Sequence, residues 1–200
     1  MKPPQPASAG APAFSLAVYC GSRHGDSPLF AQAARDLGNL IGQHGARLVY
    51  GGGKVGLMGV VADATLAAGG SAVGVIPRSL LDREVGHHGL SELIVVDTMH
   101  QRKLAMAERA DAFVALPGGI GTLEELYEVW SWQQLGYHDK PVALLNVDGY
   151  YDALLAFTQQ GHRRGFISDA QHAALLVDDD AGRLFERLRV AARHATAPDD

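Results

Sequence analysis

The centre of this chain reads Phe113-Val114-Ala115-Leu116-Pro117-Gly118-Gly119-Ile120-Gly121-Thr122-Leu123-Glu124-Glu125. An apolar run of strand length ends in a glycine-rich turn, and an amphipathic segment reaching Leu135 starts directly after it. The glycines and Thr122 therefore lie where a strand turns into a helix. Backbone N–H groups at such a turn can approach an anion closely, and the helix N-terminus adds unpaired donors. This stretch predicts a phosphate site, with Thr122 as a cap or a hydroxyl contact.

The two carboxylates that follow have a mixed meaning. Glu124 and Glu125 suit the positive end of a helix dipole, but they would repel a phosphate placed too near. We expect one of them to serve a different part of the ligand.

Outward from this turn, apolar runs alternate with helical patterns in the manner of repeated βαβ units. We predict strands at residues 16–20, 47–50, 72–76, 93–96, 112–116 and 142–145. Helices are predicted at residues 28–41, 57–68, 99–109, 122–135, 151–163 and 181–192, and residues 77–90 read as a loop. The fold class is α/β, a single Rossmann-like, doubly wound, mainly parallel sheet with helices on both faces. Such sheets bind ligands at the carboxyl ends of their strands, where each glycine-rich turn of this chain lies.

Composition narrows the class of protein. The chain has 200 residues, of which 47% are hydrophobic and 20% charged, and its net charge of −5 argues against nucleic acid as a partner. No stretch approaches the roughly 20 apolar residues of a membrane span, and the start lacks a signal-peptide core. We expect a cytoplasmic protein without a membrane partner. Its organisation is predicted as a disordered Pro/Ala-rich tail at 1–13, one domain at 14–194 and a flexible tail at 195–200.

Two further glycine turns are candidate ligand contacts. The turn at residues 51–56 has dinucleotide-fingerprint spacing, but the next strand ends in Pro77 rather than in an acidic residue, and the P-loop pattern fails. We interpret Gly52 and Gly53 as a second anion or ribose contact. Gly21 and Ser22 close the first strand, where a third contact and a simple turn are equally open.

Other chemistries lack their signatures. His87-His88 is the only close histidine pair, so no metal site is predicted, and no Gly-x-Ser-x-Gly elbow occurs. The single cysteine, Cys20, reads as a small buried side chain rather than a nucleophile. Trp130 and Trp132 favour core or interface packing over base stacking. The run 178–180 of three aspartates is typical of a helix start.

In combination, these motifs resemble the Lonely Guy family, cytokinin riboside 5′-monophosphate phosphoribohydrolases once widely labelled lysine decarboxylases. The resemblance covers nearly the whole chain. It is carried by residues 99–103, Met-His-Gln-Arg-Lys, and by residues 117–125, with support from 50–53, 138–141 and 146–151. It implies a catalytic domain that hydrolyses the N-glycosidic bond of an N6-modified or plain adenosine 5′-monophosphate, giving the free base and ribose 5-phosphate. It implies no organic cofactor and no metal, and a homodimer whose subunits complete each other's site.

The resemblance also implies positions for the site. Ligand contacts would be Glu84, Arg102, Lys103, residues 119–125 and Ser131, with Arg102 and Glu125 as the catalytic pair. By composition alone, Arg102 and Lys103 would instead favour a solvated helix face. With the glycine turns, the predicted substrate-binding set is Gly21, Ser22, Gly52, Gly53, Glu84, Arg102, Lys103, Gly118, Gly119, Ile120, Gly121, Thr122, Leu123, Glu124 and Ser131.

Physical chemistry agrees with these roles. Cleaving a ribosyl–nitrogen bond builds positive charge on the sugar, so a carboxylate beside the anomeric carbon stabilises the transition state and can orient the attacking water. Thr122 and Glu125 share one stripe of the predicted helix, so the threonine could hold phosphate while the glutamate faces the ribose. Arg102 would position the substrate and balance the carboxylate.

The alternative is a nucleotide-binding or carrier protein on the same fold, in which no bond is broken. A pyridoxal-dependent decarboxylase needs a Schiff-base lysine, and Lys54, Lys103 and Lys140 have better explanations in binding or in turns.

Overall fold

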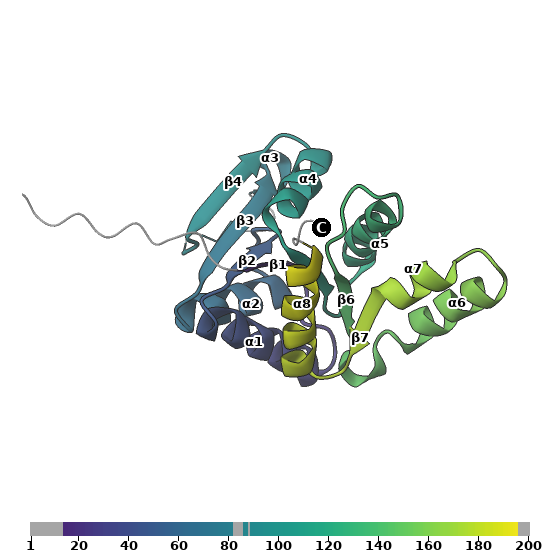
Figure 1. Ribbon diagram of the computed structural model, residues 1–200. Coiled ribbons are helices and arrows are strands. Elements are labelled where there is room, and N and C mark those ends of the chain that lie inside the picture. The colour runs from purple at the N-terminus through teal and green to yellow at the C-terminus, as the bar shows by residue number, and fades with distance from the viewer. Residues whose placement is uncertain (1–13, 82–85, 88, 196–200) are drawn as a thin grey trace, which may run out of the picture.

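The computed structural model describes residues 14–81, 86–87 and 89–195. Its strands lie in one seven-stranded sheet of order β4-β3-β2-β1-β5-β6-β7, and every neighbouring pair is parallel (Figure 1). The strands are β1 Ser15–Tyr19, β2 Arg47–Tyr50, β3 Ser71–Pro77, β4 Glu92–Val96, β5 Ala112–Ala115, β6 Val142–Leu145 and β7 Leu175–Asp178. The predicted fold class, a Rossmann-like α/β sheet, is confirmed.

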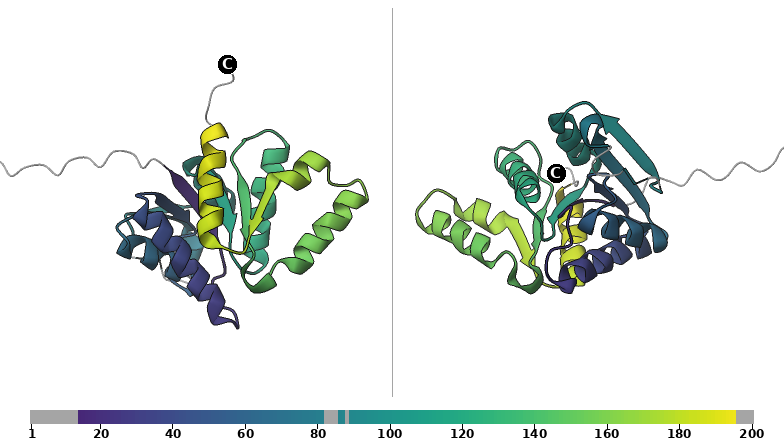
Figure 2. Two further views of the ribbon diagram at one scale, coloured as in Figure 1. Left: turned by 60° about the horizontal axis from the view of Figure 1, so that its bottom comes forward. Right: turned by 180° about the vertical axis from the view of Figure 1, so that it is seen from behind.

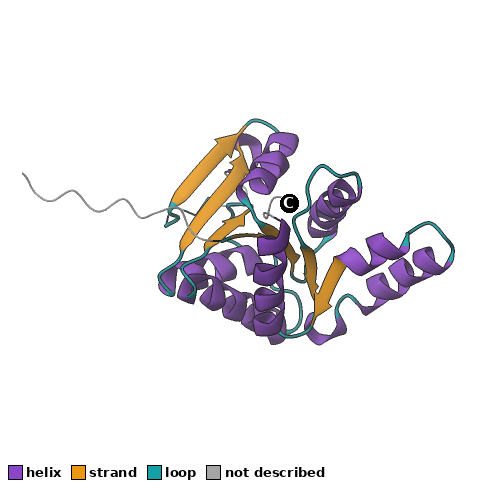
Figure 3. Ribbon diagram, viewed as in Figure 1, coloured by secondary structure: helices purple, strands orange, loops and turns teal. Residues whose placement is uncertain are grey.

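Helices cover both faces of the sheet (Figure 3). They are α1 Pro28–Gln43, α2 Gly56–Ala67, α3 Arg78–Leu81, α4 Met99–Arg109, α5 Ile120–Gln134, α6 Asp152–Arg163, α7 Asp169–Ala174 and α8 Ala181–Ala195, with a 3₁₀ turn, η1, at Val147–Gly149. Helices α1, α2 and α8 share one buried cluster with the sheet, whereas α4 and α5 share the other (Figure 2).

Successive side chains of the central strands point to opposite faces of the sheet, and this alternation produces the two buried clusters. In β1, Leu16 and Val18 belong to the cluster under α1, α2 and α8, whereas Ala17 and Tyr19 belong to the cluster under α4 and α5. Because both faces are covered, the strand is apolar throughout, which is typical of a parallel sheet. The sequence showed this as an unbroken hydrophobic run.

Helix starts follow the capping residues that the sequence offers. Ser27 accepts a hydrogen bond from the Leu29 N–H at 3.3 Å, with Pro28 at the first position of α1. At α4, Thr98 Oγ1 accepts from the Gln101 N–H at 3.1 Å, and Gln101 Oε1 accepts from the Thr98 N–H at 3.2 Å. This capping box starts α4 directly after β4 and so sets the position of Arg102 on its first turns.

The structure adds elements that the sequence patterns did not predict. The short helix α3 lies inside the predicted 77–90 loop. Strand β7 forms one edge of the sheet, and α7 lies beside α6 (Figure 1). Helix α8 reaches Ala195, one residue past the predicted end of the domain. The two predicted tails otherwise lie outside the described residues. Among the described helices, none combines the length and the apolar character that crossing a membrane requires.

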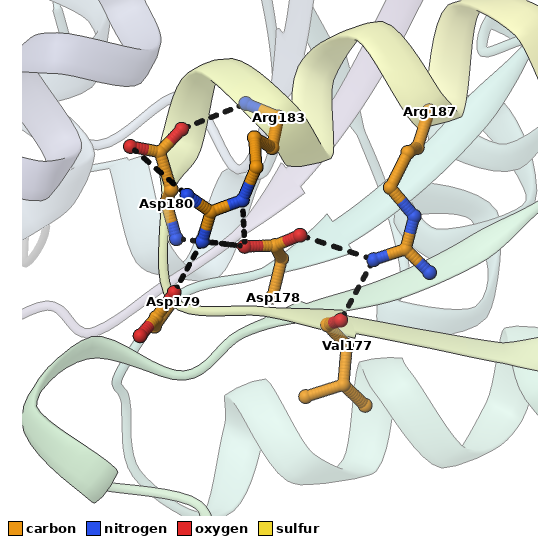
Figure 4. A network of polar contacts seen from close by, with 6 residues as sticks. All are labelled: Val177, Asp178, Asp179, Asp180, Arg183 and Arg187. Atoms are coloured by element: carbon orange, nitrogen blue, oxygen red, sulfur yellow. Dashed lines mark hydrogen bonds and ion pairs between the residues drawn. The ribbon is translucent and has the colours of Figure 1, made fainter.

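The aspartate run at 178–180 joins β7 to α8 (Figure 4). Asp180 Oδ1 accepts from the Arg183 N–H at 2.8 Å, as expected of a helix start, but Asp178 is the last residue of β7. Arg183 Nη2 donates to Asp178 Oδ1 at 2.7 Å, and Arg187 Nη1 donates to Asp178 Oδ2 at 3.1 Å. Burial alone would raise the pKa of Asp178, but these hydrogen bonds and one from the Asp180 N–H lower it to about 2.

Candidate active site

The sheet order reverses between β1 and β5, since the chain runs outward from β1 to β4 and then returns to the other side of β1. The two turns that leave these strands therefore lie side by side. The Gly21 N–H donates to the Pro117 carbonyl at 3.0 Å, and the Leu57 N–H at the start of α2 donates to the Gly21 carbonyl at 3.0 Å. A crevice at such a reversal point is the expected ligand site of an open parallel sheet.

A cleft of about 480 Å³ opens at this point, within the usual size range of small-molecule sites. It is built from the turn after β1, the starts of α1, α2, α4 and α5, and the loop after β6. Its lining consists of Cys20, Gly21, Ser22, Arg23, His24, Gly25, Phe30, Leu57, Met58, Met99, Arg102, Pro117, Gly118, Gly119, Ile120, Gly121, Thr122, Glu124, Glu125 and Tyr150.

The N-terminus of α5 forms one wall of the cleft. Gly119 is its cap and offers no side-chain cap, and the Leu123 N–H is the first to bond back, to the Gly119 carbonyl at 3.1 Å. The N–H groups before Leu123 precede the first intrahelical bond of α5, in the place where helices bind anions. Gly118 makes this geometry possible, because a Cβ there would lie 2.1 Å from Thr122 Oγ1 and 2.9 Å from the Gly21 nitrogen.

Arg102 reaches the cleft from α4 and is only 6% exposed. Its Nε donates to the Val75 carbonyl at 3.1 Å and its Nη2 donates to the Gly51 carbonyl at 2.9 Å. Val75 lies near the end of β3 and Gly51 directly follows β2, so the edge of the sheet sets the plane of the guanidinium. A fixed cation at the mouth of the fold can bind an anion or a carboxylate without first losing side-chain entropy.

Glu125 reaches the same cleft from α5 and is half-buried. Its charge and that of Arg102 act on the same neighbours. Burial raises the pKa of Cys20 at the floor of the cleft, the Glu125 charge raises it further, and the Arg102 charge opposes both. The pKa of Tyr19 is raised by the same combination of burial and Glu125, again opposed by Arg102. The charges of Glu125 and Arg102 therefore both act on the buried residues Tyr19 and Cys20.

Lys103 does not belong to the lining of the cleft. It is 7% exposed and pairs with Glu124 and, at 2.9 Å, with Glu128. Burial alone would lower the pKa of Lys103, but its hydrogen bonds to the two carboxylates raise it. The lysine thus ties α4 to α5, and Glu124 lines the cleft with its carboxylate engaged by this lysine.

The triple-glycine turn after β2 makes several contacts within the protein. The His87 N–H donates to the Gly52 carbonyl at 3.2 Å, and Gly53 forms a bridge to Gly86. His87 Nε2 lies 2.8 Å from Asp63 Oδ1 on α2, and its Nδ1 accepts from the Gly89 N–H at 3.1 Å. The turn therefore holds Arg102 through Gly51, and it holds Gly86 and His87 through Gly53 and Gly52.

The cleft brings together many of the predicted site residues: Gly21, Ser22, Arg102, Gly118, Gly119, Ile120, Gly121, Thr122, Glu124 and Glu125. Within the described part of the chain, its lining does not include Gly52, Gly53, Lys103, Leu123 or Ser131. Ser131 is exposed on α5, one turn before the helix ends. Glu84 lies outside the described residues.

The sequence patterns missed several lining residues, among them Phe30, Leu57, Met58, Met99 and Tyr150. The first four lie at the starts of helices that follow strands of the sheet, so the rule that ligands bind at carboxyl ends could have indicated them. Tyr150 lies in the 146–151 motif, for which the sequence suggested no role. Across the described residues, no group of three or more His, Cys, Asp or Glu side chains could hold a metal ion.

The sequence is similar to those of known proteins. A family model described as "Possible lysine decarboxylase" matches residues 58–188. A probable cytokinin riboside 5′-monophosphate phosphoribohydrolase of Oryza sativa subsp. japonica is 49% identical over 181 residues, covering 90% of this chain and 79% of that protein. A cytokinin riboside 5′-monophosphate phosphoribohydrolase of Arabidopsis thaliana is 47% identical over 173 residues, covering 86% of this chain and 76% of that protein.

Solved structures share the fold at lower identity. A molybdenum cofactor binding protein from Rippkaea orientalis has a TM-score of 0.68 at 23% identity, covering 88% of this chain and 95% of that chain. A molybdenum cofactor carrier protein from Chlamydomonas reinhardtii has a TM-score of 0.68 at 19% identity, covering 90% of this chain and 98% of that chain. At these identities the likeness shows the fold alone.

Proposed function

This chain belongs to the family of cytokinin riboside 5′-monophosphate phosphoribohydrolases, and from that membership we propose how its cleft carries out the reaction. The enzyme hydrolyses the N-glycosidic bond of adenosine 5′-monophosphates, N6-modified ones among them, and releases the free base and ribose 5-phosphate. The observation that supports this best is one cleft that combines a helix N-terminus with Arg102 and Glu125.

The 5′-phosphate binds at the N-terminus of α5. Backbone N–H groups of residues 119–122 and the Thr122 hydroxyl are suited to its oxygens, and the turn Gly21-Ser22 lies directly beside them. Glu125 follows Thr122 by three residues and so lies nearly one turn further along the helix. A substrate whose phosphate is held at the helix start would then present its ribose to the Glu125 carboxylate.

Glu125 stabilises the transition state. Positive charge develops on the sugar as the bond to the base breaks, and a nearby carboxylate favours that charge and can orient the attacking water. Arg102, held by two backbone carbonyls, positions the substrate and balances the charge of the carboxylate. No step of this scheme requires a cofactor or a metal ion.

The enzyme is a homodimer in which each subunit adds residues to its partner's site. Ser131 is exposed on α5, and Leu135 and Tyr137 near the end of that helix are 62% and 75% exposed. Trp130 is 9% exposed and its Nε1 donates to the Gln171 carbonyl at 3.2 Å, so this tryptophan is an internal residue rather than part of the contact surface. Light scattering coupled to size-exclusion chromatography tests the dimer, and a monomer at micromolar concentration contradicts it.

The reaction is tested with the purified protein, AMP and isopentenyladenosine monophosphate. Separation of the products should give free base and ribose 5-phosphate in equal amounts. Adenine without ribose 5-phosphate would mean another reaction, and intact nucleotide in both incubations would support the carrier alternative. A preference between the two substrates follows from the ratio of their kcat/KM values.

A further inference from the structure

Tyr150 lines the cleft from the loop after β6, between η1 and α6. Its hydroxyl donates to the Gly118 carbonyl at 2.5 Å, and its ring packs edge-on against Phe30 with the centroids 5.6 Å apart. Tyr151, the next residue, donates its hydroxyl to the Leu116 carbonyl at 2.6 Å. Two successive tyrosines thus hold the carbonyls of residues 116 and 118, on either side of Pro117.

The loop that carries these tyrosines has a defined backbone. Asn146 Oδ1 accepts from the Tyr151 N–H at 2.7 Å, while Asn146 Nδ2 donates to Asp152 Oδ1 at 2.8 Å. Asp148 and Gly149 have φ angles of +53° and +68°, a conformation that most residues avoid. A loop held in this way presents the Tyr150 hydroxyl at a fixed place. The residues of the 146–151 motif thus hold the tyrosine that contacts the turn after β5.

The peptide unit between Gly118 and Gly119 joins two residues without side chains, so its backbone torsions are less restricted than those of other residues. Gly118 is closely surrounded, since a Cβ there would lie 2.1 Å from Thr122 Oγ1, whereas a Cβ at Gly119 would meet nothing within 4 Å. The hydrogen bond from Tyr150 therefore adds a restraint on the orientation of this peptide unit. Because the bond is planar and trans, the Gly118 carbonyl and the Gly119 N–H point in opposite directions. Whatever holds the carbonyl also decides where the N–H points.

We propose that Tyr150 is a positioning residue that orients the Gly119 N–H for the substrate phosphate by holding the Gly118 carbonyl. The inference rests on the proposed function only in taking the phosphate to bind at the start of α5. Tyr150 acts on phosphate affinity through the backbone, whereas Arg102 and Glu125 act on the sugar. Its removal should therefore weaken every ligand that carries the phosphate and spare ligands that lack it.

The test is Tyr150→Phe, which keeps the ring against Phe30 and removes only the hydroxyl. Tyr127→Phe is the matched control, because Tyr127 is 38% exposed and does not line the cleft. Calorimetry measures the dissociation constants of ribose 5-phosphate and of adenine, and thermal unfolding is followed in parallel. Loss of one neutral hydrogen bond should weaken ribose 5-phosphate about threefold to tenfold in Tyr150→Phe, with adenine affinity unchanged and the unfolding midpoint lowered by only about 2–4 °C.

In steady-state assays with AMP, the same variant should raise KM by a similar factor and leave kcat within about twofold. Unchanged affinity for ribose 5-phosphate, or a fall in the unfolding midpoint without any loss of affinity, would overturn the proposal. A loss of adenine affinity equal to that of ribose 5-phosphate would also overturn it, since the hydroxyl would then act on the base. If the unmodified protein hydrolysed neither nucleotide, the proposed function would fail, while the ribose 5-phosphate titration would still decide the role of Tyr150.

Discussion

Replacing Gly51 by alanine should displace the Arg102 guanidinium and so lower the activity of the enzyme. Gly51 follows β2, and its carbonyl accepts the hydrogen bond from Arg102 Nη2 at 2.9 Å. A Cβ at position 51 would lie 1.9 Å from Nη2 and 3.0 Å from Cζ of the same side chain. Since ordinary van der Waals contact begins at 3.4 Å, the guanidinium would have to retreat by about 1.5 Å.

The two expected effects of this change differ in size. The atom in the way is the end of a long side chain, so Arg102 can move and the fold survives. The weakened charged hydrogen bonds should lower the free energy of unfolding by about 1.5–3 kcal/mol at most. A catalytic group displaced by about 1 Å, however, typically costs about 100-fold in rate. We therefore expect kcat/KM for AMP to fall by about 100-fold in Gly51→Ala, with the protein still folded.

The assay is release of adenine from AMP, together with urea unfolding of each variant. Gly161→Ala in α6 is a suitable control, because its Cβ would meet only the Ile167 side chain, at 3.1 Å. Arg102→Ala and the double variant Gly51→Ala/Arg102→Ala complete a cycle. If Gly51 acts through Arg102, the double variant should be no less active than Arg102→Ala alone. Full activity in Gly51→Ala, or multiplicative losses in the double variant, would refute the reasoning.

Three further predictions address other parts of the molecule. Glu125→Gln should retain binding of AMP in calorimetry but lose turnover, because the amide cannot stabilise positive charge on the sugar; unchanged turnover would remove Glu125 from the mechanism. Lys103→Met should lower the free energy of unfolding, measured in urea, by about 1–2 kcal/mol, a figure reduced because Glu124 is exposed. KM should stay unchanged. A higher KM at unchanged stability would instead indicate that Lys103 contacts the substrate. Asp178→Asn should lower the urea midpoint at pH 6, because the pKa of Asp178 is held at about 2 in the folded protein against an ordinary 3.8. That stabilisation is complete above pH 3.8 and disappears as the pH falls towards 2, so a difference between the two proteins that persists near pH 2 would contradict the role given to this carboxylate.

Much of the sheet was predictable because its signals are local. The central strands are continuous apolar runs with both faces buried, and the helices between them begin at Ser27-Pro28 and at the capping box of Thr98 and Gln101. The edge strand β7 escaped prediction because it has four half-buried residues and follows a helix of only six. Such short elements are decided by what they pack against rather than by their own periodicity.

The sequence predicts which residues form the site, and the structure shows what each of the described ones contacts. The sequence predicts one site from the turn at 117–125 and Arg102, and these residues, apart from Leu123, line one cleft. Lys103 follows Arg102 in the same motif, and from its position on α4 it pairs with Glu124 and Glu128. Gly52 and Gly53 have the spacing of a phosphate turn, but they contact the segment at 86–87. Neither outcome follows from spacing along the chain, because both depend on which element lies opposite.

The sequence by itself determined the alternation of strands and helices, the glycine turn at the start of α5 and the identity of the charged residues near it. These follow from hydrophobic period, turn chemistry and helix capping, which act over a few neighbouring residues. Only the tertiary structure decided that the ends of β2 and β3 hold the Arg102 guanidinium, and that Tyr150 holds the Gly118 carbonyl. Each of these hydrogen bonds joins residues at least 27 positions apart, so it exists only once packing of the helices on both faces has set the order of the strands.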